Sequence, residues 1–228
     1  MVKETRDRPA REAPDEREVL SYWFPPGIHS ADAETYREQW LQWFAGGPRV
    51  EREIADRFGS VLEQARRGEL DSWAETPRRR LALIIVLDQF SRSIYKSTPL
   101  AYARDPAALK LAREGIEAGL DRGMEVAERL FFTLPLGHAE GPDHLERLDL
   151  AVRHAEEQLY LAPAHLKPLY EHSLGQAKGH RDVIARFGRH PHRNAVLRRA
   201  STPEELEYLR SEVPVHKRRP RSEDREDD

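Results

Sequence analysis

The fold is decided by the stretch Leu81-Ala82-Leu83-Ile84-Ile85-Val86-Leu87-Asp88-Gln89-Phe90-Ser91-Arg92. It opens with seven consecutive apolar residues, and polar residues follow without a turn. A helix that is apolar on every face must be covered on all sides, so we expect a central helix over residues 78–95. Asp88 and Arg92 are four residues apart, in the acid-before-base order that favours an ion pair on one helix face. With Gln89, they are interpreted either as a structural group that fixes the helix or as part of a binding site.

The segments on both sides of this helix also show helical spacing. Apolar residues recur at i, i+3, i+4 and i+7, and the alternation typical of strands is absent. Two helix starts carry the capping-box pattern, Asp143 with Glu146 and Thr202 with Glu205. The sequence therefore predicts an all-α fold of about nine helices in stacked antiparallel pairs, with no sheet. Besides the central helix, the expected helices cover residues 15–24, 31–44, 51–67, 107–120, 126–134, 143–159, 164–187 and 202–209.

The composition bounds the domain organisation and the partners. The chain has 228 residues, 39% of them hydrophobic, which suits one domain with a real core. We expect a single helical domain over residues 15–212, between disordered, highly charged tails at 1–14 and 213–228. A net charge of −3 argues against a dedicated nucleic-acid binder, and no apolar run reaches the ~18 residues that a membrane span needs. The lack of cysteine excludes thiolate chemistry and fits a cytoplasmic location.

Aromatic residues are frequent in the first third of the chain. Their helical spacing favours core packing over a ligand-stacking site. The residues concerned are Trp23, Phe24, Trp40, Trp43, Phe44, Phe58 and Trp73.

A second polar group follows the apolar segment that ends at Leu134. Pro135 and Gly137 break the helix, and His138 and Glu140 come next. In irregular chain, two residues at this spacing can both reach one cavity. They are the candidate catalytic residues, as an acid/base pair; alternatives are two metal ligands or a plain surface turn.

A third polar group lies between Arg186 and Arg199. This segment holds five arginines, two histidines and no carboxylate, which indicates a place where anionic groups are held. The alternative is that the arginines cap helix ends and pair with acidic helices. The candidate binding residues are His180, on the preceding helix, and Arg186, Arg189, His192, Arg193 and Asn194.

Four motifs together resemble a family of bacterial proteins, domain of unknown function 924. They are Trp40-x-x-Trp43-Phe44, Leu87-Asp88-Gln89-Phe90-x-Arg92, Leu134-Pro135-Leu136-x-His138-x-Glu140 and Arg186-Phe187-Gly188-Arg189-x-Pro191-His192-Arg193-Asn194. The resemblance covers roughly residues 19–209. It implies a tetratricopeptide-like helical fold and a polar signature made of the candidate residues above, but no established molecular function.

We therefore expect the three polar groups to converge on a pocket that binds a small anionic ligand. Whether a reaction is catalysed stays open at this point, and no cofactor is assigned. One alternative is a non-catalytic scaffold that binds an acidic peptide or protein partner. Another is a metal-assisted or acid/base enzyme acting on a small molecule. Nucleic acid and membrane are not expected as partners.

Overall fold

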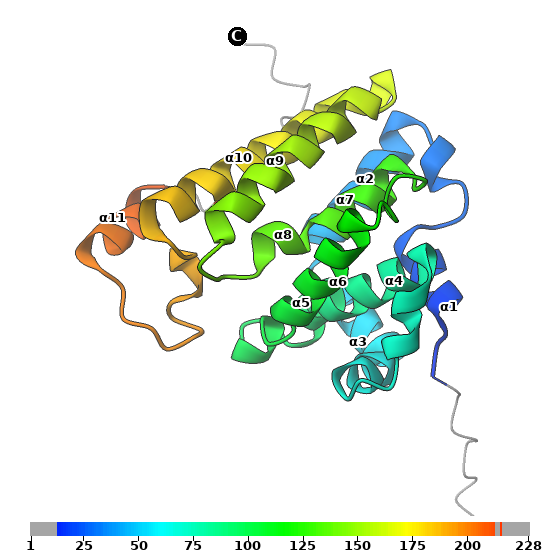
Figure 1. Cartoon of the computed structure of the whole chain (residues 1–228), viewed down its shortest axis with the longest axis horizontal. Helices are drawn as coiled ribbons and strands as arrows, with labels where there is room; N and C mark the ends of the chain where they lie inside the picture. Colours follow the sequence, from blue (N-terminus) through cyan, green and yellow to red (C-terminus); the bar gives the residue numbers. More distant parts are fainter. Residues whose placement is uncertain (1–12, 213–214, 216–228) are drawn as a thin grey trace, which may run out of the picture.

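The computed structural model describes residues 13–212 and residue 215, and within them it contains helices and no strand (Figure 1). The all-α prediction is confirmed, and so is the number of about nine helices. Nine α-helices of eight or more residues lie in the described part: α1 Glu16–Trp23, α2 Ala33–Ala45, α3 Gly47–Arg66, α4 Pro77–Ile84, α6 Asp105–Glu117, α7 Val126–Thr133, α9 His144–Leu161, α10 Lys167–Phe187 and α11 Pro203–Ser211. Two single turns, α5 Ser91–Ile94 and α8 Pro135–His138, lie between them.

The tails predicted at 1–14 and 213–228 lie outside the described residues, apart from positions 13, 14 and 215. None of the helices that the structure describes combines the length and the apolar character that a membrane crossing requires.

The apolar stretch forms the central helix, as predicted. α4 continues through a π-helical segment, Ile85–Phe90, into α5. All residues from Leu81 to Ser91 are buried, and α3, α6 and α7 pack around this helix. The wider π-helical turn accommodates an extra residue in the helix, and such turns occur frequently at functional sites. Here the turn carries Asp88 and Gln89.

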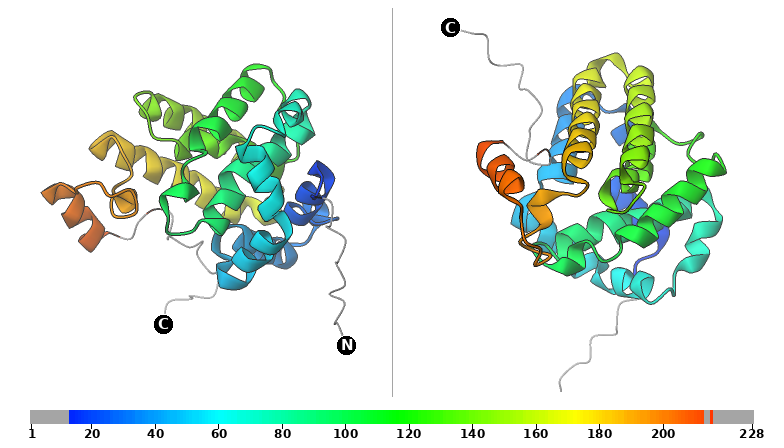
Figure 2. Two further views of the ribbon diagram at one scale, coloured as in Figure 1. Left: turned by 90° about the horizontal axis from the view of Figure 1, so that it is seen from below. Right: turned by 60° about the vertical axis from the view of Figure 1, so that its left-hand side comes forward.

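α9 and α10 form an antiparallel pair, in which α9 also packs against α7 and α8 (Figure 2). Near its start, α10 is held to α2 by a hydrogen bond of 2.6 Å between the hydroxyls of Tyr170 and Tyr36. At its other end, α10 stops at Gly188, whose φ of +68° suits glycine. There Val183 packs on Tyr208 of α11. α10 is therefore held near both of its ends, and its middle faces the cleft described below.

Three local predictions differ from the structure. α3 begins at Gly47 rather than at residue 51, because Pro48 fits the first turn of a helix. The Asp143 capping box does not form, since that carboxylate instead accepts hydrogen bonds from Arg147 and Arg113 at 3.0 and 3.1 Å. Residues 135–138, expected to be irregular, form the helical turn α8. The capping box of Thr202 is confirmed.

Candidate functional site

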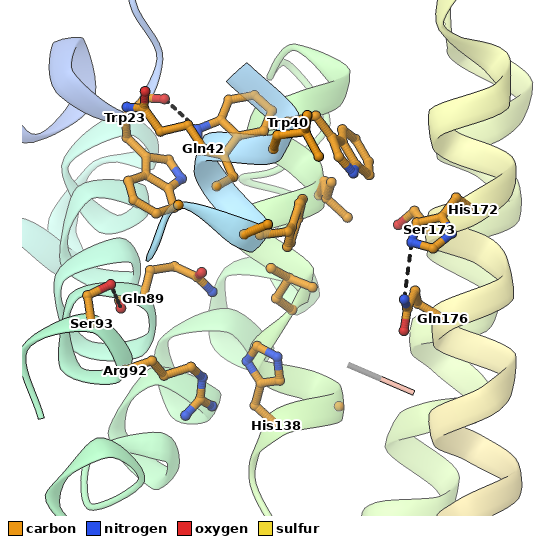
Figure 3. A pocket seen from close by; sticks show the side chains of 18 of the residues that line it. Trp23, Trp40, Gln42, Gln89, Arg92, Ser93, His138, His172, Ser173 and Gln176 are labelled. Carbon is orange, nitrogen blue, oxygen red and sulfur yellow. Dashed lines mark hydrogen bonds between the residues drawn. The ribbon is translucent and has the colours of Figure 1, made fainter. Parts of the chain in front are cut away.

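A cleft of about 800 Å³ lies between the α9–α10 pair and the helices that face it (Figure 3). One wall is formed by the end of α1, α2, the first residues of α3, the central helix, α7 and α8, and the other by α9 and α10. This volume falls within the range of small-molecule pockets, roughly 300–1,000 Å³. The cleft has an apolar end and a polar end.

The apolar end is built from the aromatic residues of the first two helices. Trp23, Trp40 and Trp43 are buried and belong to the core, as predicted, but they also line the cleft. Phe44 lines it as well, stacked on Phe131 at 5.6 Å between ring centroids, with its own side chain 44% exposed. Core packing therefore describes these residues only in part, because the same side chains form an aromatic wall.

The polar end brings together residues from the central helix, α8 and α10. Gln89, Arg92 and His138 lie on one side, and His172, Gln176 and His180 lie on the facing helix. Figure 3 shows the first three opposite His172 and Gln176, whose ring and amide nitrogens are 3.1 Å apart. His172, Gln176 and His180 are spaced four residues apart, so one face of α10 presents all of them.

Asp88 lies behind this polar end and is fully buried. Its carboxylate accepts hydrogen bonds from Gln89 Nε2 at 2.6 Å and Arg92 Nη2 at 3.2 Å. His138 Nδ1 lies 2.9 Å from both carboxylate oxygens. Burial opposes ionisation of Asp88, but the positive charge that His138 carries when its ring is protonated and that of Arg92 outweigh it and hold the pKa of this carboxyl below its ordinary value. Asp88 is therefore an ionised hydrogen-bond acceptor that orients the imidazole.

A second buried carboxylate, Asp105, completes the charge balance. It accepts hydrogen bonds from Arg92 Nη2 at 3.0 Å and from Arg193 Nη1 at 3.2 Å. Burial is the main reason why the pKa of Asp105 is raised. Both guanidinium groups also lie over the ring of Tyr102. Asp105 was not among the candidate residues, because its partners Arg92 and Arg193 lie far away in the chain.

Glu140 lies in a different network from His138. It forms a forked ion pair with the Arg199 guanidinium and accepts a hydrogen bond from the His190 backbone N–H at 2.8 Å. Burial raises the pKa of Glu140, but the hydrogen bonds from Arg199 and His190 lower it by more. The pKa therefore lies below its ordinary value, and the carboxylate stays ionised. The structure therefore does not bring His138 and Glu140 together in one cavity.

The arginine segment is largely neutralised by glutamates. Arg186 pairs with Glu204 at 2.8 Å. Arg189 donates two hydrogen bonds to Glu205, at 2.7 and 2.8 Å, and the buried Asn194 donates to the same carboxylate. These contacts attach the segment to α11. Of the third candidate group, His180 alone lines the cleft.

The histidines of this region surround His190. The Gly137 carbonyl accepts hydrogen bonds from Nε2 of His144 and of His190, at 3.0 and 3.2 Å. The rings of His180 and His192 each lie 5.3 Å from that of His190. Burial lowers the pKa of His144 to about 4 and lowers that of His190 well below its ordinary value, so both are neutral. In residues 13–212 and 215, no three His, Asp or Glu side chains are grouped to hold a metal ion.

Comparisons with known proteins agree with the resemblance seen in the sequence. Residues 19–212 match the family of bacterial proteins of unknown function named DUF924. A solved structure of a protein of unknown function from Agrobacterium tumefaciens is 34% identical, with a TM-score of 0.67, and the alignment covers 85% of this chain and 96% of that one. No curated protein matches the chain. The protein therefore belongs to the DUF924 family.

Proposed function

We propose that the protein binds a small organic anion in the cleft, with the apolar part of the ligand on the aromatic wall and its charged group at the polar end. The observation that carries this proposal is that the cleft is lined by aromatic and apolar side chains at one end and by polar side chains at the other. Phe44 and Leu41 line the apolar end and expose 44% and 37% of their surface. Large apolar side chains that are exposed together often mark the place where a ligand or partner binds.

The charged residues of the whole lining favour a negative charge in the ligand. Among the residues that line the cleft are two cations, Arg92 and Lys96, three histidines and one carboxylate, Glu51. Lys96 forms an ion pair with Glu51, with 59% of the lysine side chain exposed. Such exposed pairs contribute only about 0–1 kcal/mol, so Lys96 can turn to a ligand at little cost. Arg92 is held by two buried aspartates, so it forms part of the floor of the cleft and does not turn to a ligand.

Two further residues of the lining leave polar atoms without a protein partner. Nε1 of Trp23 and Oε1 of Gln158 are buried, and within the described residues neither has a hydrogen-bond partner. An unsatisfied buried group costs about 1–3 kcal/mol. Because neither atom is exposed to the cleft, this cost belongs to the fold and adds nothing to the recognition of a ligand.

The experiment is a thermal-shift screen. The probes are butanoate, octanoate, dodecanoate, indole-3-acetate and inorganic phosphate. Because a ligand that binds only the folded state stabilises it, we expect the longer or aromatic carboxylates to raise the melting temperature by several degrees. Inorganic phosphate, which has no apolar body, should raise it much less.

A variant pair ties the effect to the cleft. Ala177 of α10 lines the cleft, whereas Ala185 of the same helix is exposed and outside it. Ala177→Phe fills the cleft without removing a polar contact, so it should abolish the shift, and Ala185→Phe should leave it unchanged. An equal shift in both variants, or no shift with any carboxylate in the wild type, would contradict the proposal.

The scaffold alternative has less support, because the arginines suited to an acidic peptide are paired with glutamates. The tetratricopeptide-like stacking implied by the resemblance remains part of our proposal, with the α9–α10 pair as its clearest repeat-like unit. A cytoplasmic location, suggested by the lack of cysteine, belongs to the same proposal.

A further inference from the structure

We infer that His138, oriented by Asp88, is a general base that hydrolyses an ester of the organic acid held in the cleft. This inference rests on the proposed function, because it uses the same cleft. It adds a reaction and assigns the roles of two residues.

The first argument is the geometry of the imidazole. Since Asp88 is ionised and can only accept, the proton shared with it must be carried by His138 Nδ1, 2.9 Å away. In the neutral ring, Nε2 is then the unprotonated nitrogen. His138 lines the cleft with its side chain 23% exposed, and no described residue forms a hydrogen bond with Nε2. A basic nitrogen is thus available to a molecule in the cleft.

The second argument is that the pair is held rigidly. Asp88 is fully buried, so it cannot reach a ligand and acts as a positioning residue. Its other hydrogen bonds, from Gln89 and Arg92, fix the carboxylate. On the other side, Arg193 Nη1 donates to the His138 carbonyl at 2.8 Å and fixes the backbone of α8. A catalytic group that is already held in its reactive orientation accelerates a reaction more than a mobile group does.

The third argument concerns charge. The two aspartates, Asp88 and Asp105, balance the two guanidinium groups of Arg92 and Arg193. The positive charge that His138 acquires during the reaction therefore forms beside an ionised carboxylate within a neutral cluster. An imidazolium hydrogen-bonded to a buried carboxylate is stabilised in the same way in histidine-based hydrolysis generally.

Hydrolysis requires water as its only co-reactant. His138 Nε2 takes a proton from a water molecule while the water oxygen forms a bond to the acyl carbon. The carbon–oxygen bond to the leaving group then breaks, and the departing alkoxide takes the proton from Nε2. The products are an alcohol and a carboxylic acid, which ionises beside Lys96. The product is the type of ligand proposed for the cleft.

The test uses p-nitrophenyl octanoate as substrate and octanoate as ligand. General acid–base catalysis contributes about 10²–10⁴-fold, so His138→Gln should lower kcat/KM by on the order of 100-fold or more. Gln can still donate to Asp88. The control His165→Gln changes an exposed histidine outside the cleft and should leave the rate unchanged. Hydrolysis should also be slower in D2O, because a proton moves in the transition state, and p-nitrophenyl acetate should react less efficiently.

A measurement on the wild-type protein alone covers the case in which His138→Gln fails to fold. Diethyl pyrocarbonate acylates neutral imidazole, so hydrolysis should fall in step with modification of His138, located by mass spectrometry. Octanoate should protect that residue. Full activity of a protein modified at His138 would overturn the inference.

The outcomes separate the two proposals. If octanoate raises the melting temperature but the wild type and His138→Gln hydrolyse the ester equally, the catalytic role is wrong and the binding function stands. If no carboxylate shifts the melting temperature and Ala177→Phe changes nothing, the proposed function itself fails.

Discussion

Arg193 and Asp105 form an ion pair of 3.2 Å in which the two side chains are only 6% and 5% exposed. They are 88 positions apart in the sequence, and the pair joins the segment after α10 to the start of α6. Because Arg193 also donates to the His138 carbonyl, this arginine supports the floor of the cleft from behind. Its charge is already neutralised before any ligand enters.

Arg193→Met is therefore expected to destabilise the protein by about 3–5 kcal/mol, since it leaves the buried Asp105 short of a partner. Urea denaturation at neutral pH measures the loss. The matched control is Arg186→Met, which removes exposed pairs with Glu204 and Glu212 and should cost far less, because solvent screens such pairs. Equal losses would show that burial does not decide the contribution of these pairs.

The hydrogen bond between Tyr36 and Tyr170 attaches α10 to α2 beside the cleft. Either Tyr→Phe change alone leaves the other buried hydroxyl unsatisfied, at about 1–3 kcal/mol. The double variant removes both hydroxyls and should cost less than the sum of the two single changes. Thermal or urea unfolding of the four proteins gives the coupling energy, and strict additivity would argue against the contact.

Gly115 of α6 packs directly against the ring of Phe132, and a Cβ at this position would collide with the ring. Gly115→Ala should destabilise the protein by about 1–3 kcal/mol through overpacking. In α3, a Cβ at Gly59 would meet no neighbouring atom within 4 Å, so Gly59→Ala should stabilise the protein by about 0.5–1 kcal/mol. Urea unfolding gives the change in unfolding free energy of each variant relative to the wild type. Changes of the same sign in both variants would refute the close approach of α6 and α7.

Stability should fall on mild acidification because His144 is buried and neutral. Its pKa is about 4 in the folded protein, against 6.5 as the ordinary value. The unfolded chain therefore takes up a proton first, and the contribution of His144 is present above pH 6.5 and lost as the pH falls toward 4. The full loss is on the order of 3 kcal/mol. Urea midpoints between pH 7 and 4 should decrease less in His144→Gln than in the wild type.

Much of the fold could be predicted from the sequence because its signals are local. The apolar run from Leu81 to Leu87 led to the central helix, and Thr202 with Glu205 marked the start of α11. The turn α8 was not foreseen, since Pro135 was interpreted as a helix breaker although it fits a first helical turn. The π-helical segment left no local signal, because its side chains are those of any buried helix.

The site was predicted less well, for a physical reason. Asp88 and His138 were both candidates, but they are 50 positions apart, and sequence spacing could only suggest Glu140 as the partner of His138. The run of arginines looked unbalanced because the compensating glutamates belong to other segments. Lys96 was missed altogether, since it follows the central helix at an exposed position.

The π-helical turn at Ile85–Phe90 also widens the central helix at the place where it carries Asp88 and Gln89. Such a turn holds one more residue than an α-helical turn, so the residues after it keep the directions that they would have in a regular helix one residue shorter. Deleting one residue between positions 85 and 87 would therefore leave Arg92 facing Asp105, but it would remove the widened backbone around Asp88. A related sequence that is one residue shorter there would mark a protein whose central helix is regular throughout.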